Sequence, residues 1–202
     1  MNLFYKIIFF LFIIFFSFLN ISLSYGSEQS FDSWLLDYKK YALKKGVSQK
    51  TINYVFKDVE FLEQVIKYDR KQPEFYEDTI TYVSKRANLQ RVKKAKKLYL
   101  DNNNLFNLVE KEFAVERELL LSLWGIETNF GKHVGKMDII SSLATLSYDQ
   151  RRRDFFSREL LILLQLIDKK LIEKNTLYGS WAGAYGNFQF MPSTIKNYAI
   201  DY

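Results

Sequence analysis

The residue best suited to chemistry in this sequence is Glu127, which follows the leucine-rich stretch 116–123 and lies between Trp124 and Phe130. A carboxyl group in poorly hydrated surroundings is disfavoured in its charged form and therefore holds its proton. Such a group can serve as a general acid near neutral pH. We therefore expect Glu127 to occupy a partly dry environment and to donate a proton. The competing interpretation is a surface glutamate near a helix end.

A second segment, residues 179–193, is too specific in composition to be a generic loop. Together with the segment around Glu127 it contains five of the eight glycines in the chain. Glycine is favoured where a backbone bends sharply or comes close to a ligand. The two segments together therefore mark a site.

These two segments resemble the signature of the membrane-bound lytic murein transglycosylase B family, peptidoglycan-cleaving enzymes with a lysozyme-like fold. The resemblance covers about residues 31–202, and further matches lie at residues 72–75, 142–146, 151–152 with 155–156, and 159–161. It implies an all-α, lysozyme-like catalytic domain over residues 27–202.

The resemblance also implies a mechanism with one glutamate, Glu127, which acts first as acid and then as base. The 6-hydroxyl of muramic acid closes onto its own anomeric carbon and leaves a 1,6-anhydro end, a step favoured by high effective molarity. An ordinary glycoside hydrolase would need a second carboxylate. Asp138 and Asp149 are the nearest aspartates that follow, and both fit better as helix caps.

The same resemblance indicates the residues that bind substrate. Ser180 and Gln189 match positions that hold the sugar, and their hydroxyl and amide groups suit N-acetyl and hydroxyl recognition. The alternative for both is hydrogen bonding that stabilises the loop. Arg151 and Arg152 match a paired arginine and can bind stem-peptide carboxylates in a bidentate fork.

Residues 1–26 read as a secretory signal peptide, with Lys6 near the start, an apolar run over residues 7–19 and small residues near the cleavage point. An uncleaved anchor is the alternative. Export predicts a periplasmic protein. Since the chain has no cysteine, we exclude a lipoprotein, disulfides and thiolate metal sites, and the single histidine cannot build a metal cluster.

The formal net charge is +6, and many of the basic residues lie between positions 85 and 97. Export argues against nucleic acid as the partner, and a solvated helix face explains the run. The expected partners are peptidoglycan glycan strands. The basic charge also suits peripheral association with the anionic cell envelope.

The chain otherwise predicts helices separated by short loops, with no strand pattern. Gly46 should end the first helix, and Ser48, Asp138, Asp149 and Ser193 should cap later ones. The predicted helices cover residues 31–45, 49–56, 77–88, 90–100, 105–113, 116–126, 139–147, 151–168 and those after 193 through 200.

The sequence ends at Tyr202, where members of the family continue with another segment that contains a candidate calcium loop and residues of the substrate cleft. We therefore expect a domain whose C-terminal part is missing and which holds no cofactor. The alternative function is a non-catalytic peptidoglycan-binding or assembly protein that keeps the cleft without a complete active site.

Overall fold

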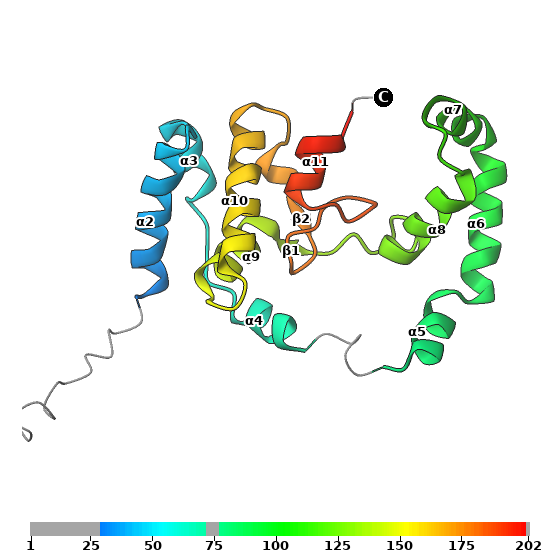
Figure 1. Ribbon diagram of the computed structural model, residues 1–202, viewed down its shortest axis with the longest axis horizontal. Helices are drawn as coiled ribbons and strands as arrows, with labels where there is room; N and C mark the ends of the chain where they lie inside the picture. Colours follow the sequence, from blue (N-terminus) through cyan, green and yellow to red (C-terminus); the bar gives the residue numbers. More distant parts are fainter. Residues whose placement is uncertain (1–28, 72–76, 201–202) are drawn as a thin grey trace, which may run out of the picture. The chain divides into compact units, whose positions relative to one another are not determined.

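The computed structural model describes residues 29–71 and 77–200 (Figure 1). The chain divides into Met1–Ser30 and a compact unit, Phe31–Tyr202, to which every element below belongs. Its elements are α2 (Phe31–Lys44), α3 (Gln49–Val55), α4 (Glu63–Arg70), α5 (Thr79–Arg86), α6 (Leu89–Asp101), α7 (Asn103–Phe113), α8 (Arg117–Thr128), β1 (Met137–Asp138), α9 (Ile139–Tyr148), α10 (Arg153–Asp168), the 3-10 turn Lys174–Thr176, β2 (Tyr178–Gly179) and α11 (Pro192–Tyr198). The structure confirms the predicted all-α class.

The core of the unit is built around α9, in which every residue except the last, Tyr148, is buried. This helix packs on α10, α4 and α2, and α3 and α11 pack on α10. Most of the buried side chains are aliphatic or aromatic, and their burial is the main favourable term in folding. The largest side chains that are completely buried are Phe156, Ile52, Ile139, Ile140, Leu143, Leu146, Leu160, Leu163, Leu164 and Leu177.

A second group of helices, α6, α7 and α8, packs within itself. Neither α6 nor α7 contains a buried residue, whereas α8 buries Leu121, Gly125 and Thr128. This group therefore has a thin apolar interior. The position of α8 depends correspondingly on its polar contacts with the rest of the chain.

Two of the four predicted caps are confirmed. The Ser48 hydroxyl accepts the Thr51 amide at 3.2 Å, and the Asp138 carboxylate accepts the Ser141 amide at 2.6 Å. Each satisfies an amide that has no partner inside its helix.

The other two predicted caps are wrong. Asp149 ends α9 and does not begin α10, whose N-cap is Arg152. Ser193 lies one residue inside α11, because Pro192 takes the first position, where its missing N–H costs nothing. The amide of Ser193 donates instead to the buried Glu159 carboxylate of α10 at 2.8 Å.

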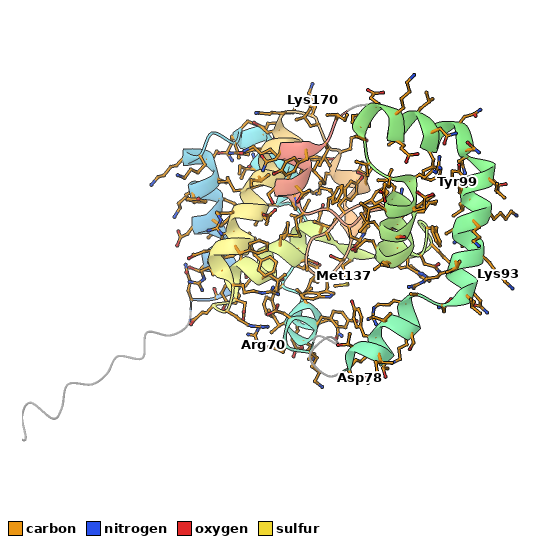
Figure 2. The ribbon with its side chains drawn as sticks, turned by 45° about the vertical axis from the view of Figure 1, so that its right-hand side comes forward. Arg70, Asp78, Lys93, Tyr99, Met137 and Lys170 are labelled. Carbon is orange, nitrogen blue, oxygen red and sulfur yellow. The ribbon has the colours of Figure 1, made fainter. Side chains whose placement is uncertain are left out.

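The structure adds two features that the sequence patterns missed. One is α4, a short helix whose inward residues are Val65 and Asp69. The other is an antiparallel pair of two-residue strands, in which Met137 (labelled in Figure 2) lies opposite Gly179. Such short strands carry no alternation of apolar and polar residues, so the pattern could not reveal them.

Candidate active site

Glu127 lies in the last turn of α8, and its side chain is exposed to solvent. Leu121, Gly125 and Thr128 form the buried face of the helix. Because successive residues of an α-helix are rotated by about 100°, Glu127 points away from the direction of Thr128. The prediction of a partly dry environment is therefore wrong for the described residues. Glu127 is open to a ligand, and no hydrogen bond or ion pair to its carboxyl group is found within residues 29–71 and 77–200.

The aromatic side chains expected around Glu127, those of Trp124 and Phe130, pack against each other at the end of α8. Trp124 and Phe130 meet edge to face with their centroids 5.7 Å apart. Phe130 also covers Gly125 so closely that an added Cβ there would lie 2.8 Å from its ring. Gly125 is thus required for the close packing of Phe130 on α8.

The backbone after α8 makes an unusual turn. Asn129, Phe130 and Gly131 all have positive φ, at 50°, 59° and 79°. Residues other than glycine adopt this left-handed region at a cost and persist there only when the surroundings hold them. Lys94 of α6 supplies one such contact, because its ammonium donates to the Asn129 carbonyl at 2.9 Å and lies 5.0 Å from the Phe130 ring centroid.

The second predicted segment forms a folded loop between β2 and α11, drawn in orange in Figure 1. Ser180 accepts the Ala184 amide through its hydroxyl at 2.9 Å. Gln189 has a φ of 50°, and its amide nitrogen donates to the carbonyls of Val134 and Gly186 at 3.1 and 2.9 Å. Both side chains therefore stabilise the loop. Within residues 29–71 and 77–200, the Ser180 hydroxyl donates no hydrogen bond and the Gln189 amide oxygen accepts none.

Asn187 joins this loop to the end of α8. Its side-chain oxygen accepts the indole N–H of Trp124 at 3.1 Å, and its backbone carbonyl accepts the Thr128 hydroxyl at 2.8 Å. Gly131 lies so close that an added Cβ would be 2.8 Å from the Asn187 oxygen. No motif or spacing in the sequence predicts a role for Asn187 or Thr128. Their only sequence signal is their position inside the two marked segments.

The aromatic residues of the loop divide between core and surface. Trp181 and Tyr185 are half-buried and pack against the core, while Phe188 stacks on the exposed Phe190 with centroids 6.0 Å apart. Trp181 also contacts the exposed ring of Tyr68 on α4, with centroids 6.5 Å apart. Aromatic faces that remain accessible in this way can pack against the apolar face of a sugar ring.

Arg151 and Arg152 both bind a carboxylate of the protein itself. Asp69 of α4, whose side chain is only 1% exposed, accepts from Arg151 at 2.9 Å and also from Arg152. Arg70, labelled in Figure 2, donates to the same carboxylate at 2.8 Å. The two predicted substrate-binding arginines are thus fixed by Asp69.

A surface pocket of about 740 Å³ lies beside these arginines and is lined by residues 150–155 and Arg158. Arg151 and Arg152 keep 42% and 38% of their side chains exposed. They therefore remain accessible to an anion from this pocket although each already contacts Asp69.

Neither candidate for a second carboxylate is free. Asp138 caps α9. Asp149 accepts from Arg70 at 2.8 Å and from the Arg151 amide at 3.1 Å. Burial favours the neutral form of Asp149, but these hydrogen bonds and the Arg70 charge outweigh it and lower its pKa. Both aspartates therefore serve the fold.

Residues 29–71 and 77–200 contain no group of three or more histidine, cysteine, aspartate or glutamate side chains that could hold a metal ion. In the same residues, no helix combines the length and the apolar character needed to cross a membrane. The predicted signal peptide, residues 1–26, and the family match at residues 72–75 both lie outside the described residues.

The glutamate helix, the glycine-rich loop and the surrounding helices define a transglycosylase domain of the lysozyme-like class. The chain belongs to the family described as the transglycosylase SLT domain, whose model matches residues 30–202. The resemblance inferred from the two sequence segments is thereby confirmed.

Individual relatives agree with this placement. The chain is 41% identical over 91 residues to membrane-bound lytic murein transglycosylase B of Escherichia coli K12, covering 45% of this chain and 25% of that protein. It is 33% identical to SltB3 from Pseudomonas aeruginosa, solved in complex with NAG-NAM-pentapeptide, with a TM-score of 0.81 over 86% of this chain and 46% of that one.

The Escherichia coli lytic transglycosylase Slt35, solved in complex with calcium, is 27% identical with a TM-score of 0.72. That match covers 83% of this chain and 54% of the relative. The chain thus spans about half or less of the length of these relatives.

Proposed function

We propose that the protein is a lytic transglycosylase that cleaves the β-1,4 bond between MurNAc and GlcNAc in peptidoglycan and leaves 1,6-anhydro-MurNAc ends. The observation that carries the proposal is that the end of α8, on which Glu127 is exposed, is joined through Asn187 to the loop with Ser180 and Gln189. The family membership and the peptide-bearing glycan bound by SltB3 support the same substrate class.

In the proposed mechanism Glu127 donates its proton to the glycosidic oxygen as the bond to the anomeric carbon breaks. The muramic acid 6-hydroxyl then attacks that carbon, and the Glu127 carboxylate removes the hydroxyl proton. The second step is intramolecular in the substrate and needs no water, so holding the sugar in a reactive geometry supplies much of the rate. One carboxylate is enough for both proton transfers.

The exposure of Glu127 is compatible with this role. A carboxyl that must reach a polymeric substrate has to be accessible before the substrate binds. Leu123 and Ile126, the exposed apolar neighbours of Glu127 on α8, together with the bound sugar would exclude water from the carboxyl. We therefore propose that the glycan completes the dry environment that the protein alone does not provide.

Ser180, Gln189, Arg151 and Arg152 are the proposed substrate-binding residues. The first two would bind the sugar through the hydroxyl proton and the amide oxygen that the loop leaves available. The arginines, held by Asp69 at the edge of the pocket of about 740 Å³, would bind carboxylates of the peptide attached to the glycan. In this scheme Asp69 orients the arginines without touching substrate.

Mass spectrometry of purified peptidoglycan after incubation with the protein tests the proposal. Wild type should release products with 1,6-anhydro ends, and Glu127→Gln should release none because the amide cannot donate the required proton. Glu112→Gln, an exposed glutamate on α7, is the matched control and should be fully active.

Two other results would contradict the mechanism. Reducing ends would indicate hydrolysis by water. Absence of cleavage by a folded wild-type protein that still binds the glycan would favour the non-catalytic binding or assembly protein.

We also propose that residues 1–26 direct export to the periplasm and that residues 27–202 act there, with peripheral association with the envelope. The basic composition supports attraction to anionic envelope polymers, which should weaken as salt increases. Cell fractionation combined with mass measurement of the protein tests this. A cytoplasmic protein that retains its first 26 residues would refute it.

A further inference from the structure

We infer that Asn187 is a positioning residue that holds the glutamate helix α8 in register with the sugar-binding loop. This inference rests on the proposed function and adds a residue to it. The carboxyl group of Glu127 has no hydrogen bond in the described residues, so it is placed only by the helix that carries it. Whatever fixes the end of α8 relative to Ser180 and Gln189 therefore fixes the distance over which the proton is transferred.

Asn187 is suited to this task because it contacts α8 at two points one helical turn apart. Its side-chain oxygen takes the Trp124 indole N–H at 3.1 Å, and its carbonyl takes the Thr128 hydroxyl at 2.8 Å. The same Thr128 hydroxyl accepts the Gly131 amide at 3.0 Å. The left-handed turn that follows Glu127 is thereby tied to the same loop residue.

Packing between helices offers little substitute for these contacts. The main packing partners of α8 are α6 and α7, whereas the loop is attached to the separate core of α9 and α10. The two hydrogen bonds of Asn187 therefore join α8, which carries Glu127, to the loop, which carries Gln189 two positions after Asn187. Loss of the Asn187 side chain removes the bond to Trp124 and leaves only the backbone bond to Thr128, so the two sides should shift while each stays folded.

The test compares Asn187→Ala with Asn187→Asp. Alanine removes the acceptor for the Trp124 indole, whereas aspartate keeps an oxygen in the same place. A displacement near 1 Å can cost about 100-fold in rate, so Asn187→Ala should lower kcat on soluble glycan strands by about 10- to 100-fold and change KM by less than about threefold. Asn187→Asp should restore most of kcat. Asn175→Ala is the matched control, because its side chain also accepts from an aromatic residue, the Tyr54 hydroxyl at 3.4 Å.

A measurement without substrate separates this inference from the proposed function. The chain has three tryptophans, so three indole N–H signals are expected in a ¹⁵N NMR spectrum. In Asn187→Ala the indole signal of Trp124 should shift and its proton should exchange faster with solvent. The amide signals of residues 127–131 should shift as well. In Asn187→Asp and Asn175→Ala both sets of signals should stay unchanged.

The outcomes are decisive in each direction. If wild type fails to cleave, the proposed function fails, and the NMR signals alone decide whether Asn187 holds α8. If wild type cleaves, a normal kcat for a folded Asn187→Ala, or a raised KM with unchanged kcat, overturns the inference. If Asn187→Ala does not fold, Thr128→Val replaces it, since valine keeps the shape of the buried threonine and loses the bonds to the Asn187 carbonyl and the Gly131 amide.

Discussion

Replacing Asp69 by asparagine should destabilise the protein strongly. The carboxylate is almost completely buried and accepts from three guanidinium groups, those of Arg70, Arg151 and Arg152. An asparagine keeps one acceptor oxygen but turns its amide N–H₂ toward these donors. Removing one partner of a buried ion pair costs about 3–5 kcal/mol. Because the arginine side chains are 38–44% exposed and can regain water, we expect the lower end of that range, about 3 kcal/mol.

Thermal unfolding and urea titration followed by circular dichroism measure this loss. For a chain of this size, about 1 kcal/mol shifts Tm by about 2–4 °C, so Asp69→Asn should lower Tm by about 6–12 °C. The control is Asp37→Asn, which removes an exposed ion pair with Lys40 and should cost less than about 0.5 kcal/mol. If Asp69→Asn were as stable as this control, the three guanidinium groups would not depend on Asp69, and the reasoning would be refuted.

Three further predictions use the same unfolding assays. Gly135→Ala should lower the free energy of unfolding by at least about 2 kcal/mol, because the new Cβ would lie 2.0 Å from a backbone carbonyl oxygen. Gly46→Ala has a similar φ but open space around it and should cost about 1 kcal/mol. Equal losses would show that φ alone determines the cost. Glu159→Ala should cost about 2 kcal/mol of stability because the carboxylate accepts the amide of Ser193, the first free amide of α11. Ser193→Ala keeps that amide and should change stability by less than about 0.5 kcal/mol. If Ser193→Ala were the more costly change, the serine side chain would be the cap. Because folding lowers the pKa of Asp149, its contribution to stability is complete above the ordinary aspartate pKa of 3.8 and is lost as the pH falls below that value. When Tm is measured from about pH 2.5 to 6, Asp149→Asn should be less stable than wild type near pH 6 and should lose less Tm on acidification. Parallel curves of Tm against pH for the two proteins would contradict the assignment.

Local signals in the sequence were sufficient for most of the helical architecture. Apolar residues at helical spacing placed α2, α3 and α6–α10 close to their observed bounds, since that spacing creates the face that must be buried. Ser48 and Asp138 were recognisable as caps because each supplies an acceptor three residues before an amide that its helix leaves free. Helix α4 was missed, since its eight residues include only a few apolar positions.

The caps that failed did so because tertiary contacts replaced local ones. Asp149 follows α9 and is drawn to Arg70 of α4, a residue 79 positions earlier in the chain. At α11 the acceptor is Glu159, which reaches the amide of Ser193 from a neighbouring helix. No local pattern carries this information, because both partners are brought together only by packing.

The sequence by itself determined the helical class, the family and the two segments that carry Glu127, Ser180 and Gln189, because these depend on residue types and spacing along the chain. Tertiary structure alone decided that Glu127 is exposed, since burial depends on which face of α8 meets other elements. It also decided that Asp69 binds the paired arginines and that Asn187 links the two segments. These contacts join residues more than 50 positions apart, and only the packed fold brings such residues within hydrogen-bonding distance.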